Sequence, residues 1–541
     1  MNTSRSFRVL STAAFSAGVA ACAPRTPAVP TPMPVTAAPV VTTPAPLPPA
    51  NAALPPVPRV TGPLEIKVVY PTAGQLIQSK DSNFIFGSVG NGDAALTING
   101  VLTPVWPNGS FMGWLANPPA TAPQYELVAA TPNDTARLTH PIKLLPPPLP
   151  APVPPPTADT VDAAQRITPG QYATLIGQAT VPNDTDRVVT GYAPVDNLDR
   201  WFLLPGTAVR VDSVKGNYAF VHLDSQRVVR IEKPEINLTT PVVTPPSLVA
   251  QPFTVTPAQE WVDVAIPVSG TPPYLIDVGN NSLTLTFYGT AGTAQPAVNL
   301  PASSYVSSVA SAAAQPEMRY TVSMRGPVFG FQRLWQNGVF TLRVRRPPPV
   351  DSTAPLRGLT IAVDPGHPPA GSRGPTGFWE PEATLPIGMK VRDLLLARGV
   401  NVLMTRTTPD AVDLNLRPTM ARRANAHALV SIHLNAVPDG MNPFVAQGTT
   451  TYHFWKHSEA LATTMHQALL QQLGLPDKGV KRANFALVRA TWMPAVLAEG
   501  AFMIMPDQEA AIRTPEYQER YARAIVEGLE RYFRSLGQAP R

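Results

Sequence analysis

The sequence predicts a multidomain protein in which small all-β modules and proline-rich linkers precede a C-terminal α/β domain with a mostly parallel sheet and helices on both faces. Three observations lead to this prediction. The chain has 541 residues, enough for three or four domains. Proline accounts for 66 of them, so it must gather in linkers or end short strands. Only after about residue 356 do apolar strand patterns alternate with helical ones, which is the order of an α/β domain.

The composition excludes several classes of protein. Hydrophobic residues make up 44%, an ordinary value for a globular protein, so the whole chain is not disordered. The 42 basic and 36 acidic residues leave a net charge of +6, which is too mild and dispersed for a nucleic-acid partner. Cys22 is the only cysteine. The chain therefore cannot form an intramolecular disulfide, and any metal site must use nitrogen and oxygen ligands.

Residues 1–22 are predicted to be a lipoprotein signal peptide. Two arginines precede a short apolar run over 9–21, which is too short to span a bilayer. The run ends in Val-Ala-Ala-Cys and resembles a bacterial lipobox, in which Cys22 is lipidated and becomes the mature N-terminus. An ordinary signal peptide is the alternative. We therefore expect an exported protein with a lipid anchor in a membrane, and Ala23 after the cysteine favours the periplasmic face of the outer membrane.

A proline-rich tether and a first β module are predicted next. Residues 23–60 are rich in proline, alanine, threonine and valine, and we expect an extended spacer. Over 61–145, short apolar runs are bounded by glycine, asparagine and proline turns, which predicts a β-sandwich-like module. Residues 146–160 form a second proline-rich linker.

Two further β modules are predicted before the α/β domain. Residues 161–240 contain alternating runs around a Lys-Gly-Asn turn and weakly resemble small barrels of the Src-homology type. Residues 250–346 are β-rich and vaguely resemble AMIN-type modules, which target enzymes to the cell wall. All three β modules are expected either to bind wall glycan or peptide, or to be structural spacers.

The domain predicted over 356–536 alternates strands and helices. Its helices are indicated by apolar residues at helical spacing, for example Ile387 with Val391, and Leu461 with Met465. The strands expected between them are 359–363, 400–404, 428–432 and 495–498.

Polar side chains stand at the strand ends and at one helix start of this domain. His433 and Glu499 directly follow predicted strands, His367 lies just past the strand 359–363, and Glu380 opens the first helix. The carboxyl ends of parallel strands meet at one edge of a sheet. Two imidazoles and a carboxylate leave an open position on zinc for water, and a second carboxylate can take a proton from that water. The alternative is that these are hydrogen-bonded surface residues, as a lone histidine after a strand usually is. The pattern His-Glu-x-x-His of the helical zinc proteases is absent. The histidines expected at the surface or in helices are His427, His453, His457 and His466.

A family resemblance adds to the prediction of a zinc site. The segments that carry it are 361–367, 377–380, 405–406, Arg417, 424–425, 431–435, 485–489 and 494–502. In this order they resemble the zinc-dependent N-acetylmuramoyl-L-alanine amidases of the Amidase_3 family, over about residues 356–533. The resemblance implies that His367, Glu380 and His433 bind zinc and that Glu499 is the catalytic carboxylate. It also implies a peptidoglycan substrate, cleaved at the amide between N-acetylmuramic acid and L-alanine.

The chain departs from the family pattern at several positions. Pro368 and Pro369 replace the usual glycines after the first histidine, and Met-Ile-Met at 503–505 replaces a polar turn. Glu382 lies two residues from Glu380 and is the alternative ligand. None of these changes removes a type of ligand, so we expect an active enzyme.

Three more residues are candidates for substrate contact or for support of the ligands. Arg489 either helps to stabilise the oxyanion or is a surface charge. Asp364 either holds an N–H group near the site or shapes a turn. Asn435 follows His433 closely and is undecided between the same roles. A catalytically inactive wall-binding lipoprotein and a zinc peptidase acting within the stem peptide are the rival functions. The sequence identifies no protein activator.

Overall fold

The computed structural model describes residues 40–49, 51–145, 171–177, 188–194, 199–242, 247–314 and 316–538. The predicted signal peptide with Cys22, most of the predicted tether and the linker at 146–160 lie outside these ranges. The modules described below all belong to one unit of the chain, residues 41–541. Within the described ranges, no helix is both long enough and apolar enough to cross a membrane.

The first β module consists of two sheets around one core. Its strands are β1 (Lys67–Tyr70), β2 (Leu76–Ile77), β3 (Ser82–Ser88), β4 (Ala95–Ile98), β5 (Val101–Thr103), β6 (Ser110–Ala116), β7 (Gln124–Ala130), β8 (Thr135–Pro141) and β9 (Lys143–Leu144). The sheets β1-β3-β6 and β5-β4-β7-β8 face each other, and β2 pairs with β9. Ile85 of β3 and Leu127 of β7 belong to the shared core. Because side chains alternate along a strand, the neighbours of Ile85 on β3 point away from this core.

The second β module is a seven-stranded antiparallel sheet around its own core, in the order β12-β11-β15-β14-β13-β10-β16. Its elements are β10 (Tyr172–Leu175), β11 (Val189–Tyr192), β12 (Asp199–Leu203), β13 (Ala208–Lys215), β14 (Tyr218–His222), β15 (Val228–Glu232), the short helix η2 (Lys233–Glu235) and β16 (Ile236–Val242). The predicted Lys-Gly-Asn turn lies in the hairpin between β13 and β14.

The third β module has a four-stranded sheet, β18-β19-β27-β26, and a five-stranded sheet, β20-β21-β25-β24-β23, around a common core. The pair β17-β22 completes it. Its strands are β17 (Leu248–Ala250), β18 (Thr254–Pro257), β19 (Trp261–Pro267), β20 (Tyr274–Val278), β21 (Ser282–Phe287), β22 (Thr290–Gly292), β23 (Val298–Asn299), β24 (Val306–Ala314), β25 (Glu317–Met324), β26 (Gly330–Gln336) and β27 (Val339–Arg345).

The C-terminal domain is built on a six-stranded sheet in the order β29-β28-β30-β33-β31-β32. Its elements are β28 (Thr360–Pro365), α1 (Glu380–Leu396), β29 (Asn401–Met404), α2 (Leu416–Arg423), β30 (Ala428–Asn435), α3 (Pro443–Ala446), β31 (Thr449–His453), η3 (Lys456–Ser458), α4 (Glu459–Leu473), β32 (Asp477–Arg482), η4 (Leu487–Arg489), β33 (Ala495–Phe502), α5 (Pro506–Ile512) and α6 (Pro515–Gln538). All neighbouring strands pair in parallel except β31 and β33.

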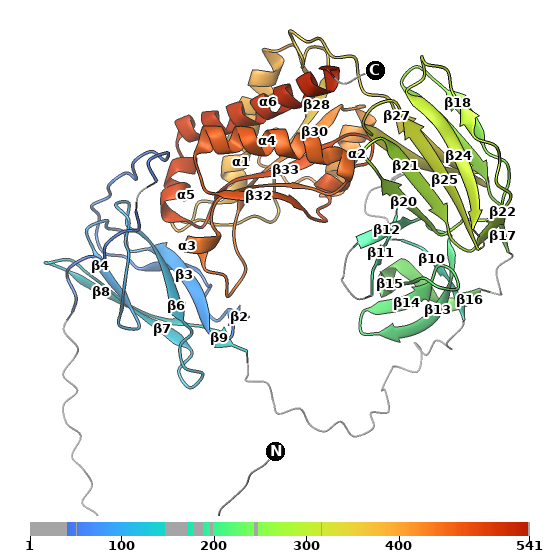
Figure 1. Ribbon diagram of the computed structural model, residues 1–541. Helices are drawn as coiled ribbons and strands as arrows, with labels where there is room; N and C mark the ends of the chain where they lie inside the picture. Colours follow the sequence, from blue (N-terminus) through green and yellow to red (C-terminus); the bar gives the residue numbers. More distant parts are fainter. Residues whose placement is uncertain are drawn as a thin grey trace, which may run out of the picture. The chain divides into compact units, whose positions relative to one another are not determined.

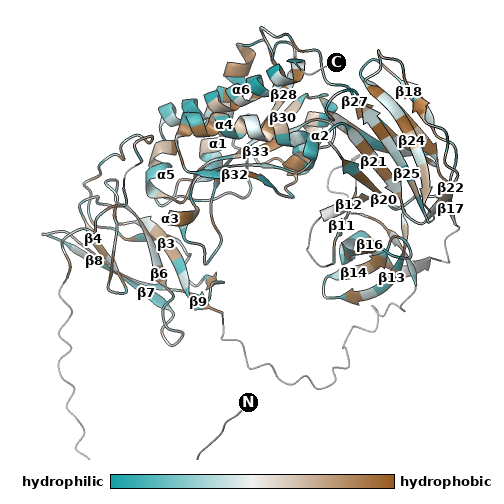
Figure 2. Ribbon diagram, viewed as in Figure 1, coloured by the Kyte–Doolittle hydropathy of each residue, from teal (hydrophilic) through white to brown (hydrophobic). Residues whose placement is uncertain are grey.

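The two faces of this sheet are covered differently. Helices α1, α4 and α6 lie together over one face, and the main core forms between them and the sheet (Figure 1). Figure 2 shows both hydrophobic and hydrophilic positions along α6, as expected for a helix with one buried side. On the other face, the core contains Ala362, Leu429 and Ala495 from three neighbouring strands, with Ala421 of α2 and Leu487 of η4. The functional candidates lie at the carboxyl ends of these strands.

Candidate metal centre and catalytic site

Three strands and one helix bring the predicted site residues together. His367 lies two residues beyond β28, and Glu380 is the first residue of α1. His433 and Glu499 lie within β30 and β33, because both strands extend further than the apolar runs at 428–432 and 495–498 indicated. The parallel register places His433 directly beside Glu499.

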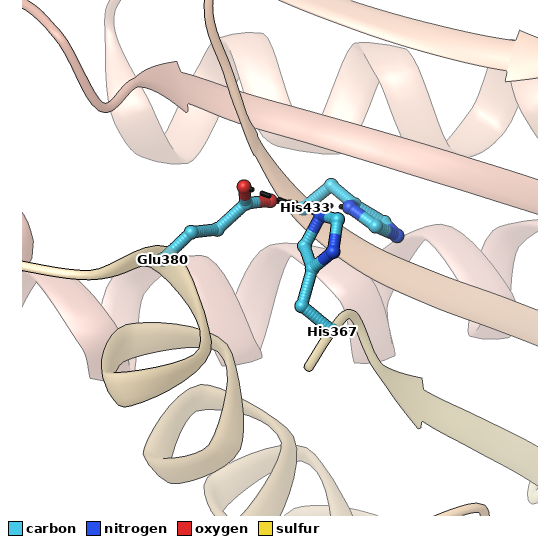
Figure 3. A group of neighbouring side chains, drawn as sticks. All are labelled: His367, Glu380 and His433. Atoms are coloured by element: carbon cyan, nitrogen blue, oxygen red, sulfur yellow. Dashed lines mark hydrogen bonds and ion pairs between the residues drawn. The ribbon is translucent and has the colours of Figure 1, made fainter. Parts of the chain in front are cut away.

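His367, Glu380 and His433 form a compact group (Figure 3). One atom from each of these side chains lies within 4.8 Å of the others. The Nδ1 atom of His433 is 3.1 Å from Oε1 of Glu380, and Nε2 of His367 is 3.3 Å from Oε2. The two imidazole rings stand nearly perpendicular, with centroids 4.8 Å apart. Two nitrogen donors and one oxygen donor therefore face one another across a small space.

Glu380 is only 2% exposed, and its side chain is held by backbone donors. The N–H of Leu434 donates to Oε1 at 3.0 Å, and the N–H of Ser372 donates to Oε2 at 2.9 Å. Burial by itself would raise the pKa of Glu380. The hydrogen bonds from His367 and His433 outweigh burial and hold this pKa below its ordinary range. The group thus contains an ionised, buried carboxylate.

The donor set fits a divalent metal ion. Two imidazoles and one carboxylate form a set typical of catalytic zinc, in which a fourth position stays open. A buried negative charge also requires a compensating positive charge. The backbone N–H of Trp379 donates to the Glu382 side chain, which caps the start of α1. The structure therefore groups Glu380, and not Glu382, with the two histidines.

Glu499 differs from Glu380 in its surroundings. Among the residues that the structure describes, none forms a hydrogen bond with its buried Oε2 atom. Burial raises the pKa of the Glu499 carboxyl well above its ordinary value, and the negative charge of Glu380 raises it further. Buried polar atoms normally have partners, so an unsatisfied oxygen beside a metal-type donor set indicates a functional group.

Asp364 supports the loop that carries His367. Its carboxylate accepts hydrogen bonds from Thr405 Oγ1, from Ser431 Oγ at 2.6 Å and from Arg417 Nη1 at 3.0 Å. Asp364 and Arg417 are both almost fully buried. Arg417 in turn donates from Nη2 to the carbonyl oxygens of His367 and Pro368, at 3.1 and 3.0 Å.

The backbone of His367 adopts a φ of +60°, which is uncommon for a residue other than glycine. The surrounding hydrogen bonds hold it there. A second buried arginine, Arg406, donates to the carbonyl oxygens of Pro365, Gly366 and Pro381. No role for Arg406 or Arg417 was predicted from the sequence. The available signal was that both residues lie in segments that carry the family resemblance.

Arg489 lines a cavity that the three clustered side chains do not line. Arg489 ends η4 and lines a cavity of about 370 Å³ together with Glu235 and Trp492. No described residue that lines this cavity belongs to the group of His367, Glu380 and His433.

Asn435 ends β30 and has a neighbour that the sequence analysis missed. Its Oδ1 accepts a hydrogen bond from the N–H of Ala436, and its side chain also interacts with the hydroxyl of Tyr452. Burial, followed by the charge of Glu499, raises the pKa of Tyr452. Tyr452 lies in β31, opposite Leu497 of β33. Residues directly opposite in two strands share one face of the sheet, so Tyr452 and Glu499 lie on the same face. Tyr452 could have been found only by predicting β31 and its register.

The remaining histidines of the domain are not part of the described metal-type group. The expectation that they lie at the surface or in helices is wrong for His453, which is buried in strand β31. His466 is in helix α4, and its Nε2 lies 2.8 Å from Oδ1 of Asp477. His427 accepts a hydrogen bond from the N–H of Thr360, and burial lowers its pKa to about 4. His457 is buried in η3.

Comparisons with known proteins place the C-terminal domain in a family. The sequence pattern of the Amidase_3 family, described as N-acetylmuramoyl-L-alanine amidase, matches residues 361–531. The "Probable cell wall amidase LytH" of Staphylococcus epidermidis is 34% identical over 188 residues, which are 34% of this chain and 62% of LytH. The chain thus spans less than two thirds of the length of that relative.

Other relatives are covered more fully. The N-acetylmuramoyl-L-alanine amidase CwlM of Bacillus licheniformis is 32% identical over 185 residues, which are 32% of this chain and 69% of CwlM. Among solved structures, the N-acetylmuramoyl-L-alanine amidase AmiC2 of Nostoc punctiforme is 33% identical, with a TM-score of 0.31, over 32% of this chain and 96% of that one. Through its C-terminal domain, the chain belongs to the N-acetylmuramoyl-L-alanine amidase family.

Proposed function

We propose that this protein is a zinc-dependent peptidoglycan hydrolase that cleaves the amide bond between N-acetylmuramic acid and the L-alanine of the stem peptide. The observation that carries the proposal is the group of His367, Glu380 and His433 with the unsatisfied carboxylate of Glu499 beside it. This constellation lies in the domain that matches the amidase family.

In this proposal His367, Glu380 and His433 hold the zinc ion. Zinc in such a set supplies a water of lowered pKa and a Lewis acid for the amide carbonyl. Glu380 brings the negative charge to the set, and its two backbone donors fix the direction of its carboxylate. Arg417 and Asp364 hold the His367 loop in place, so these two residues position a ligand and do not meet the substrate.

Glu499 transfers the proton in this proposal. Its Oε2 atom accepts a proton from the attacking water and passes it to the nitrogen of the leaving L-alanine. A raised pKa makes the ionised carboxylate a stronger base than an ordinary carboxylate. Tyr452 and Asn435 supply neutral hydrogen-bond donors on the same side of the site. Because Arg489 lines another cavity, we assign the oxyanion contact to these neutral donors instead.

We further propose that Cys22 carries a lipid that anchors the protein in the envelope, at the periplasmic face of the outer membrane. Relatives with cell-wall names support export. Replacing Cys22 with alanine should release an active protein from the membrane fraction. If the variant still sediments with membranes as the parent does, the anchor lies elsewhere.

Digestion of purified sacculi tests the activity. The purified protein, incubated with and without a chelator, should release intact stem peptides with a free L-alanine N-terminus, only when metal is present. Product masses decide between the rivals. Fragments cut within the stem peptide would indicate a zinc peptidase, and the absence of any metal-dependent product would indicate a binding protein without activity.

A further inference from the structure

Helix α5 carries a buried acidic residue outside the proposed metal site. Glu509 is fully buried, and it is not among the residues grouped as possible metal ligands. Its carboxylate instead accepts hydrogen bonds from one loop. The N–H of Thr376 lies 3.1 Å from both carboxylate oxygens, Thr376 Oγ1 donates to Oε1 at 2.7 Å, and the N–H of Phe378 donates at 3.4 Å.

That loop, residues 371–379, leads directly into Glu380. The N–H of Ser372 donates to Glu380 Oε2, and the N–H of Glu380 donates back to the Ser372 carbonyl, both at 2.9 Å. The loop is also closed on itself, since the N–H of Gly374 donates to the carbonyl of Phe378 at 2.9 Å. A displacement of the middle of the loop would therefore be transmitted to a donor that orients Glu380.

Arg513 reinforces the same contact from the next turn of the chain. Its Nη2 donates to Thr376 Oγ1 at 2.8 Å, and its guanidinium stacks on the ring of Phe378, 4.2 Å from the centroid. Thr376 Oγ1 thus accepts from Arg513 and donates to Glu509. Gly374 packs so closely that a Cβ atom there would lie 2.5 Å from the Glu509 carboxyl carbon. The loop fits this carboxylate without spare room.

We propose that Glu509 is a positioning residue. It holds loop 371–379 against α5 and thereby fixes the orientation of Glu380 toward the metal. The restraint on the loop follows from the contacts alone, whereas its effect on metal binding rests on the proposed role of Glu380 as a ligand. Removing partners that orient a ligand commonly costs 10- to 100-fold in metal affinity.

Limited proteolysis and zinc competition test this inference on the full-length protein. Arg373 is exposed within the loop and offers trypsin a cleavage site. In the metal-free state, E509Q should be cut after Arg373 at least several-fold faster than the parent, as read by mass spectrometry. Its zinc affinity, measured against a chromophoric chelator, should fall about tenfold.

The matched control is E516Q, which removes an exposed carboxylate at the start of α6 and should behave as the parent in both assays. If E509Q does not fold by circular dichroism, T376V replaces it. That variant replaces the hydroxyl shared by Glu509 and Arg513 with a methyl group, and it should show the same two changes to a smaller degree. The proposal would be overturned if the folded variant were cut after Arg373 at the rate of the parent. It would also be overturned if cleavage were faster but zinc affinity were unchanged. These readouts involve no hydrolysis of sacculi, so a failure of the proposed activity would be recognised separately.

Discussion

Two glutamates at the site differ in what surrounds their oxygen atoms. Glu380 receives two backbone N–H groups and contacts both histidines, so its negative charge is stabilised. Glu499 Oε2 has no hydrogen-bond partner in the described part of the chain, so its negative charge is penalised. Groups whose surroundings push their pKa values apart are suited to different tasks. This contrast supports a ligand role for Glu380 and a proton-transfer role for Glu499.

The two roles predict different losses. Glu499→Gln should retain zinc, because all three proposed ligands remain, and its turnover of sacculi should fall by about 10²–10⁴-fold. Glu380→Gln should lose zinc, because a neutral amide is a poor ligand. Zinc content by mass spectrometry and release of stem peptides measure both. If Glu499→Gln lost zinc and Glu380→Gln retained it, the roles of the two residues would be exchanged. If Glu382→Gln lost zinc, Glu382 would be the ligand in place of Glu380.

A second residue-scale prediction concerns the buried ion pair beneath His367. Asp364 is fully buried and Arg417 nearly so, and removing one partner leaves an uncompensated charge. Asp364→Asn should therefore lower the free energy of unfolding by about 3–5 kcal/mol. Asp393→Asn is the control, because its pair with Arg392 is solvent-exposed and should cost less than about 1 kcal/mol. Urea unfolding measures both, and equal effects would contradict the prediction.

At the scale of elements, the short helix η2 carries a carboxyl that is sensitive to pH. Burial raises the pKa of Glu235 to about 7, although the N–H of Thr190 donates to it. A carboxyl whose pKa is higher in the folded state than in the unfolded state stabilises the fold at any pH below its unfolded-state pKa. That stabilisation is lost as the pH rises through the folded-state pKa.

The second β module should therefore be less stable at pH 8 than at pH 5.5, by on the order of 1 kcal/mol after allowance for its partial exposure. In Glu235→Gln this pH dependence should largely disappear. Thermal unfolding of both proteins across the range measures the difference. The same slope in parent and Glu235→Gln would exclude Glu235 as its source.

The elements differ in how well the sequence predicts them. Strands β28, β29, β30 and β33 are indicated by short apolar runs, and the residues of the possible metal site could be named because a family pattern supplied their roles. β31 was missed, since Thr449, Thr450 and Thr451 are buried on both of its faces and give no hydrophobic alternation. β32 was missed as well, because it is a charged edge strand with a central glycine. Tyr452 was overlooked for the same reason.

At the scale of the whole molecule, there is a physical explanation for the apolar residues at 503–505, which replace the polar turn of the family pattern. Ile504 and Met505 of the C-terminal domain belong to one buried cluster with Phe84, Phe86 and Met112 of the first β module. An exposed apolar run favours aggregation, and here another part of the chain covers it. Periodicity gave no sign of this contact, because its partners lie some 400 positions apart in the sequence.

Polar contacts accompany this apolar cluster. Asp439, in the segment after β30, accepts hydrogen bonds from the hydroxyl of Tyr70, from the N–H of Gln78 at 2.8 Å and from Asn83 Nδ2 at 3.2 Å. Asn83 also accepts a hydrogen bond from the N–H of Gly440 at 3.0 Å. An apolar cluster with a polar rim is the anatomy of a stable interface. The first β module therefore covers this part of the C-terminal domain through both apolar and polar contacts.

Neighbouring residues on β3 allow this contact to be tested. Phe86 belongs to the cluster shared with the C-terminal domain, whereas Ile85 belongs to the module's own core, because successive side chains of a strand point to opposite faces. Phe86→Ala should weaken the contact while leaving the module folded, so hydrogen exchange at 503–505 and 439–441 should become faster. Ile85→Ala should lower the stability of the module by about 2–5 kcal/mol through the cavity it leaves. Below the unfolding transition, it should leave exchange in the C-terminal domain as in the parent. The contact would be refuted as a coupling surface if Phe86→Ala left exchange at 503–505 unchanged.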